Sequence, residues 1–330
     1  MDKNQYGTLV FDGILLDIEE EVPHLLNSLN NSVENCIEAI KELDGQFSLV
    51  WKTPNFSITA TDFSLTHFLY NEKTFELLEP NTIYVFDNEY NVVNKMAFFE
   101  GYSSISSITS YEFLYDAFEK NVYRILKKDP KPSLFVSDGI DSGAIHCAFI
   151  KTNKPVDIFS GYQQDAPLLK EDMIKRRQGI HREYFNSPFL INKFLNVETD
   201  DFKQFRSAIE ISPSDRLAIV GCNADRIFVN SKDYENYWMF QEEITMMQNI
   251  KDVFDEYNQR YFDFFATKNI VKEWFKIAID KRNLKYKEWM IMYCNMLNYP
   301  NFENLKNGKE VILTNNVFTI STDNMHYYDK

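Results

Sequence analysis

The chain has 330 residues, 44% of them hydrophobic, which is enough apolar material for one or two cores, so we expect two domains. Its formal net charge of -14 at pH 7 argues against broad binding to nucleic acid, although a nucleotide ligand would need only a local site. No apolar run approaches the roughly 18 residues of a membrane span, and the start, MDKNQYGTLVFDG, has no signal-peptide pattern. With four scattered cysteines, these features predict a cytoplasmic protein with reduced thiols.

The first hundred residues combine short β-rich runs with one long helical pattern. GTLVFDG predicts a strand that ends in a turn, and EEVPHLLNSLNNSVENCIEAIKEL has apolar residues at helical spacing. Short β-rich runs then alternate with turn residues: QFSLVW, FSITATD, HFLYNE, FELLE and TIYVFD. We therefore predict an α+β domain over residues 1–100, with the serine-rich stretch GYSSISSITS, residues 101–110, as a linker.

Strands and helices alternate in the next part of the chain. The predicted order is a helix in YEFLYDAFEKNVYRILKK, then PSLFVS, GAIHCAFIK, PVDIFSGY, LLKEDMIKRRQ and RLAIVGC as strand, helix, strand, helix and strand. From about Tyr234 the sequence is mostly helical in character. The alternation predicts an α/β domain with a parallel sheet over residues 111–330, and ligands at the carboxyl ends of its strands.

A loop rich in small and polar residues, SDGIDSG (Ser137–Gly143), separates the first of these strands from its helix. Outward backbone N–H groups and the helix dipole make such a loop suitable for an anion, so Ser137, Ser142 and the amides of Gly139 to Gly143 could hold a pyrophosphate. Asp141 would then supply an oxygen ligand to a Mg²⁺ that bridges the phosphates. The same residues also suit an ordinary helix N-cap without any ligand.

Several motifs together give the loop a family context. SDGIDS resembles the SGGxDS pyrophosphate loop of the asparagine synthetase class of ATP pyrophosphatases, which includes β-lactam synthetase. IFSGY (158–162) is similar to the family's FSxGF, IVGCNADRIF (219–228) to LSGEGADELF, and YPNFENLKNGKE (299–310) to its LP…RxK segment. In the first domain, LDGQFSLVW, ITATDFSLTHFLY and LLEPNTIYVFD resemble LxGMFAFAL, VARDxxGxKPLYY and the PG-centred strand that follows.

The resemblance implies a truncated, degenerate glutaminase domain of the Ntn-hydrolase type, followed by a synthetase domain of the adenine-nucleotide-alpha-hydrolase type. It implies ATP and Mg²⁺ as cofactors, with Asp141 and Asp225 as metal ligands. Lys309, with Lys306 as runner-up, would be the catalytic lysine over the reacting phosphate. The implied nucleotide-binding residues are Val136, Ser137, Asp138, Gly139, Ile140, Asp141, Ser142, Ser160, Gly161 and Gly221.

The first domain departs from the family at its glutaminase chemistry. The family begins Met-Cys-Gly, whereas this chain begins Met-Asp-Lys and has no cysteine before Cys36. Asp12 in VFDG takes the place of an amide in the family's Asn-Gly-Glu motif, and a carboxylate would repel a developing oxyanion. We therefore expect no glutaminase activity, and a structural role for this domain in packing or in a homodimer contact.

The second domain departs from the family at three loop positions. Cys222 replaces a glutamate or tyrosine beside the acyl site, where it could accept a proton or be a small buried thiol. Arg226 replaces the family's second acid, and would pair with Asp225 or contact a phosphate. Asp138 replaces the second glycine of SGGxDS, and its carboxylate at roughly 4 Å from a phosphate oxygen would cost about 4 kcal/mol unless it points away or binds a metal.

Two functions follow as expectations. In the first, the protein is a C–N bond-forming ligase that adenylates a carboxylate substrate with ATP and passes the acyl group to ammonia or an amine, releasing AMP and pyrophosphate. In the second, it is an inactive descendant that binds a nucleotide or a protein partner.

Overall fold

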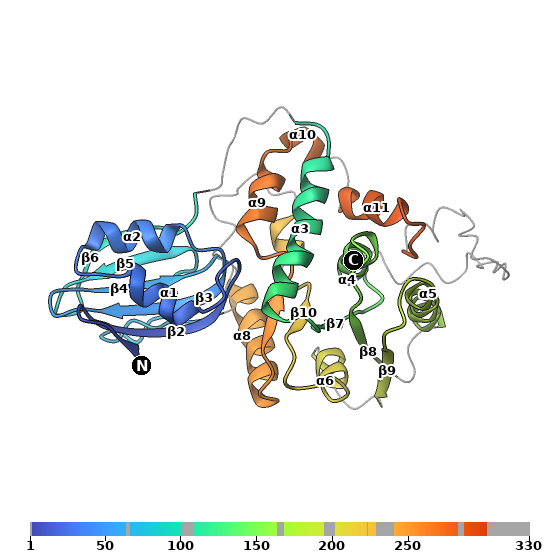
Figure 1. The fold of residues 1–330 in the computed structure, drawn as a ribbon, viewed down its shortest axis with the longest axis horizontal. Coiled ribbons are helices and arrows are strands. Elements are labelled where there is room, and N and C mark those ends of the chain that lie inside the picture. The colour runs from blue at the N-terminus through green and yellow to red at the C-terminus, as the bar shows by residue number, and fades with distance from the viewer. Residues whose placement is uncertain are drawn as a thin grey trace.

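The computed structural model describes residues 2–63, 67–100, 108–163, 168–194, 202–222, 224–228, 241–282 and 287–301. Within these ranges the chain forms an antiparallel sheet of six strands followed by a parallel sheet of five, each with helices packed on it (Figure 1). This mixed α/β composition, antiparallel first and parallel second, agrees with the prediction. The domain division at 100 and 110, and the finer assignments to known fold types, stay predictions.

The antiparallel sheet follows the chain, each strand pairing with the next. Its strands are β1 Asp2–Lys3, β2 Thr8–Leu15, β3 Gly45–Lys52, β4 Ser57–Thr61, β5 Thr82–Phe86 and β6 Val92–Ala97. The predicted single long helix is wrong, because it is divided into α1 Glu21–Ser28 and α2 Val33–Lys41. Ser32 begins the second helix as its N-cap, where its hydroxyl accepts a hydrogen bond from Asn35 N at 3.3 Å.

Every residue of β4 and β5 is buried, so both faces of the sheet are covered there. The helices α1 and α2 cover one face (Figure 1), and the indole N–H of Trp51 donates to the carbonyl of Asn30, between these helices, at 3.0 Å. On the other face Leu78 and Leu69 pack against Tyr84 and Phe86. The predicted strands HFLYNE and FELLE lie in this covering segment, which contains only an isolated bridge, Tyr70 to Leu77, within its described residues.

The parallel sheet has the strand order β11-β10-β7-β8-β9. Its strands are β7 Ser133–Phe135, β8 Asp157–Gln163, β9 Phe189–Phe194, β10 Ala218–Val220 and β11 Tyr261–Asp263. The chain starts in the centre at β7, adds β8 and β9 on one side, and then crosses to β10 and β11 on the other. The strand order therefore reverses between β7 and β10, and such a switch point is where open α/β sheets bind ligands.

Helices cover both faces of the parallel sheet. The helices are α3 Glu112–Lys128, α4 Ile140–Lys151, α5 Leu168–Tyr184, α6 Lys203–Ile209, α7 Ala224–Ile227, α8 Gln241–Glu256, α9 Lys268–Phe275, α10 Ile279–Arg282 and α11 Glu288–Asn295. Neighbouring residues of a strand point to different cores: Leu134 packs with α3 and α4, and Phe135 packs with α6 and α8. Among the described residues no helix is long and apolar enough to cross a bilayer.

Buried polar contacts join the two sheets. The Gln46 side chain on β3 accepts a hydrogen bond from Asp263 N at 2.9 Å and donates to Asp263 O on β11. Arg124 on α3 binds Asp17 at 2.8 Å and Asp44 at 2.7 Å. Gln46 is 1% exposed, so its hydrogen bonds to Asp263 exclude solvent, whereas Asp17 lies at the rim of the joint with a side chain that is 53% exposed.

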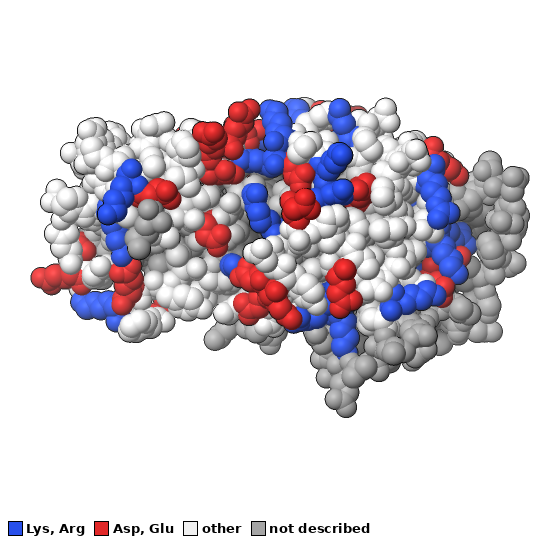
Figure 2. Space-filling model, turned by 60° about the horizontal axis from the view of Figure 1, so that its bottom comes forward, with Lys and Arg blue, Asp and Glu red and all other residues white. Residues whose placement is uncertain are grey.

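The outer surface mixes both signs of charge. On the face drawn in Figure 2, acidic and basic side chains alternate and no broad basic area is visible. The absence of broad nucleic-acid binding stays a prediction.

Candidate functional site

A cavity of about 340 Å³ lies at the switch point of the parallel sheet, where β7, β8 and β10 end. The helices α6 and α8 close its far side with Phe205, Met246 and Ile250. The structure brings together on its wall the predicted site residues Val136, Ser137, Asp141, Ser142, Gly161, Gly221 and Cys222. Residues far apart in the sequence thus meet at one apolar hollow with polar groups along one side.

The remaining predicted residues lie elsewhere. Ser160 is 1% exposed and belongs to β8 between two cavity-lining residues, Phe159 and Gly161. Asp138, Gly139 and Ile140 are close in the chain but are not among the lining residues. Lys306 and Lys309 lie outside the described residues, as do the side chains of Asp225 and Arg226; the backbone at 225 and 226 belongs to α7.

The loop after β7 is closed by its own two serines. Ser137 N donates to Ser142 Oγ at 3.0 Å, the two hydroxyl oxygens lie 3.0 Å apart, and Gly139 N donates to Ser137 Oγ at 3.1 Å. The helix α4 begins at Ile140, earlier than predicted, and its N-cap Gly139 offers no side-chain cap. Asp141 and Ser142 therefore lie inside the first turn and are not N-caps as that interpretation required. Whether the loop binds a ligand stays a prediction.

Asp138 has a basic neighbour outside the cavity. Its carboxylate lies 3.9 Å from Lys170 Nζ on α5, in an ion pair with both side chains partly exposed. The charge that would oppose a phosphate is thus offset by a nearby cation and lies outside the cavity wall.

Asp141 forms a buried ion pair that the sequence did not predict. Lys287 Nζ lies 2.6 Å from Asp141 Oδ1 and 2.7 Å from Oδ2, and the lysine side chain is 4% exposed. Lys287 is the N-cap of α11 and has left-handed backbone angles, with φ of 50°. It follows Asp141 by 146 positions in the chain, and no local pattern marks it as a site residue.

The donors fit a magnesium site only in part. Mg²⁺ is commonly held by one or two carboxylates together with phosphate oxygens, and Asp141 is a carboxylate on the cavity wall. Both of its oxygens contact Lys287, so a metal would share or take one of them. Among the described residues no three His, Cys, Asp or Glu side chains are placed to hold a metal.

The backbone of Cys222 is held by a buried carboxylate. Its N–H donates to Asp263 Oδ2 at 2.9 Å, and the other oxygen of this fully buried carboxylate accepts from Phe265 N at 3.0 Å. The half-buried Cys222 side chain lines the cavity. The strand β11, which carries Asp263, was not predicted, because its three residues, YFD, are too few to show the alternation of apolar and polar residues that marks a strand.

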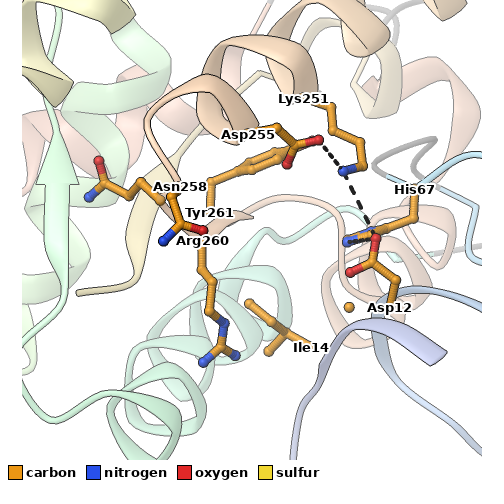
Figure 3. Close-up of a pocket in the computed structure, with 10 residues that line it drawn as sticks. Asp12, Ile14, His67, Lys251, Asp255, Asn258, Arg260 and Tyr261 are labelled. Atoms are coloured by element: carbon orange, nitrogen blue, oxygen red, sulfur yellow. Dashed lines mark hydrogen bonds and ion pairs between the residues drawn. The ribbon is translucent and has the colours of Figure 1, made fainter. Parts of the chain in front are cut away.

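A second cavity, of about 370 Å³, lies between the two sheets and includes Asp12 in its wall (Figure 3). Asp12 Oδ2 lies 3.8 Å from His67 Nε2 and 3.9 Å from Lys251 Nζ, and Lys251 pairs with Asp255 at 2.6 Å. Burial lowers the pKa of His67 to about 4, although Asp12 acts in the opposite direction. Asp12 thus belongs to a mixed-charge network, and the absence of glutaminase activity stays a prediction.

No family model matches the chain, and no curated protein matches it. Among solved structures, the chain overlaps weakly with an enzyme described as the allosteric regulatory enzyme of purine biosynthesis, at 9% identity over 86% of this chain and 77% of that chain, with a TM-score of 0.24. It overlaps similarly with the glutamine phosphoribosylpyrophosphate amidotransferase of B. subtilis complexed with ADP and GMP, at 9% identity over 87% and 78%, with a TM-score of 0.22. TM-scores of this size assign neither a fold family nor an activity.

Proposed function

We propose that the protein is an ATP-dependent ligase that adenylates a carboxylate substrate and then forms an amide bond. The observation that carries this proposal is the loop after β7. Its two serine hydroxyls and the first turn of α4 lie at one end of a cavity at the switch point, and the buried ammonium of Lys287 contacts Asp141 on the same wall. Helix N-termini and buried cations favour phosphate groups there.

The rest of the cavity suits the nucleoside. Phe159, Phe205 and Ile250 give it an apolar, partly aromatic wall for a flat base. Gly161 is required for this shape, because a Cβ there would approach Gln204 O to 2.7 Å and push α6 away. A nucleotide would then lie across the ends of β7 and β8 with its phosphates toward α4.

The reaction places distinct demands on these groups. Lys287 and the first turn of α4 would stabilise negative charge on the departing pyrophosphate, with Lys309 or Lys306 as the proposed further lysine. When bound, Mg²⁺ would supply Lewis-acid stabilisation of the same charge, and Asp141 and Asp225 are the proposed ligands. The nitrogen would come from ammonia or a substrate amine.

A second candidate function is nucleotide binding without catalysis. It is favoured by the Lys287 contacts to both oxygens of Asp141, which leave the carboxylate less available to a metal. In that case the cavity would still bind a nucleotide but would not turn it over.

Calorimetry with Mg-ATP, followed by assay of pyrophosphate release with pooled carboxylates, separates the two functions. The ligase should bind Mg-ATP and release pyrophosphate only when its carboxylate is present, and Asp141→Ala should abolish release. The matched control Asp172→Ala removes a carboxylate that pairs with Arg176 on α5, and should leave both signals unchanged. Binding without release would support the second function, and no binding would contradict both.

A further inference from the structure

A fully buried arginine lies beneath the loop after β7. Arg177 on α5 is 0% exposed, and its Nη1 donates to the carbonyl oxygens of Ser137 and, at 2.9 Å, Gly139. Its Nη2 donates to Pro300 O at 3.3 Å, and its guanidinium lies 5.3 Å from the centre of the Tyr299 ring. One side chain thus holds the loop and the start of the segment that leads to Lys306 and Lys309.

The contacts fix the orientation of two peptide groups. In a trans peptide the C=O and the following N–H point in opposite directions. Because the carbonyls of Ser137 and Gly139 face Arg177, the N–H groups of Asp138 and Ile140 face away from it. Ile140 is the first residue of α4, where N–H groups have no acceptor within the helix. The arginine therefore turns two donors outward.

The same arginine explains the last glycine of SDGIDSG. A Cβ at Gly143 would lie 2.7 Å from Arg177 Nη2 and 3.0 Å from its Cζ, so only a glycine leaves room for the guanidinium. Gly143 has no positive φ that would otherwise require it. Gly143 is therefore needed because the Arg177 guanidinium packs directly against the first turn of α4.

The charge of Arg177 is also informative. In the described part of the chain its guanidinium has carbonyl partners and no carboxylate within ion-pair distance. A buried cation without a counter-charge is costly, and an anion bound on the other side of the loop would offset that cost.

We propose that Arg177 is a positioning residue that presets the loop for phosphate by turning the Asp138 and Ile140 N–H groups away from the guanidinium, beside the cavity wall that Ser137, Asp141 and Ser142 form. The inference rests on the proposed nucleotide site. Arg177 acts through the loop and does not touch the ligand.

The test is calorimetric titration of the full chain with inorganic pyrophosphate. Arg177→Lys keeps the positive charge but loses the guanidinium's several N–H donors, so it cannot hold the carbonyls of Ser137 and Gly139 together. Pyrophosphate binding should weaken by about 10- to 100-fold, because the backbone N–H donors to the charged ligand are then no longer held in place. The matched control Arg176→Lys changes the neighbouring arginine, which pairs with Asp172, and should bind within twofold of wild type. Equal affinity for Arg177→Lys and wild type would overturn the inference.

Two further readouts separate positioning from a purely structural role. Millimolar guanidinium should restore pyrophosphate affinity to Arg177→Ala without changing that of Arg176→Ala, and failure to restore it would count against positioning. The second readout uses NMR on the wild-type protein and so does not depend on whether a variant folds. Pyrophosphate should shift the backbone amide resonances of Asp138 and Ile140 most strongly. Binding that leaves those resonances unchanged would refute the inference alone, whereas no binding by wild type would refute the proposed site as well.

Discussion

The ion pair between Lys287 and Asp141 leads to a quantitative prediction for a double-mutant cycle. The lysine side chain is 4% exposed and the aspartate side chain 23%, so removing Asp141 leaves a desolvated ammonium and removing Lys287 leaves a partly solvated carboxylate. Breaking such a pair costs about 3 to 5 kcal/mol. We expect Lys287→Met to cost about 3 kcal/mol, since water can still reach Asp141, and Asp141→Asn to cost about 4 kcal/mol, since the ammonium cannot be reached.

The double variant should cost about 2 to 3 kcal/mol less than the roughly 7 kcal/mol sum of the two single variants, because neither charge is then left without its partner. We expect a coupling free energy of about 2 to 3 kcal/mol from urea unfolding, provided that all four proteins show the same m-value. The pair Lys281 and Glu288 is a matched control, with a distance of 3.1 Å and side chains 24% and 26% exposed. Its cycle should give less than about 1 kcal/mol. A coupling below about 0.5 kcal/mol for Lys287 and Asp141 would refute the argument from burial.

Three further predictions concern the first sheet and its contacts. The pKa of His67 falls from 6.5 to about 4 on folding, so the unfolded chain binds the proton first and stability should fall by about 3 kcal/mol as the pH drops through that range. His67→Gln should flatten this dependence in urea unfolding at pH 7 and pH 4; an unchanged slope would contradict it. Gln46→Leu should cost about 2 kcal/mol by removing the two buried hydrogen bonds between Gln46 and the Asp263 backbone, and should lower Mg-ATP affinity. Glutamine incubated with the wild-type protein should release no glutamate, and any release would overturn the interpretation of Asp12.

The site could be predicted where its chemistry is local in sequence. The strand, loop and helix around SDGIDSG follow one another directly in the sequence. The sequence pattern alone therefore predicts that the polar residues of this loop lie at the end of a strand. The alternation of strands and helices likewise predicts that the loops after β7 and β10 meet. The start of α4 was misplaced because Asp141 and Ser142 fit a cap as well as a first turn.

The unpredicted parts depend on contacts between distant segments. Lys287 contacts Asp141 from the start of another helix, and Arg177 contacts the loop from within α5. In the sequence both resemble ordinary surface cations of helices. The apolar residues from α1 to α2 are spaced as in one continuous helix. The chain is nevertheless divided, because the Ser32 hydroxyl caps the start of α2.

The contacts of Gln46 have a consequence for how the chain can be divided. Gln46 holds the backbone of Asp263, and the carboxylate of Asp263 holds the amide of Cys222 on the cavity wall. The first sheet can therefore influence the cavity of the second sheet, because it sets the position of a residue on that cavity's wall. Transplanting the second half onto another protein would remove one support of its own pocket, so the natural unit for engineering is the whole chain.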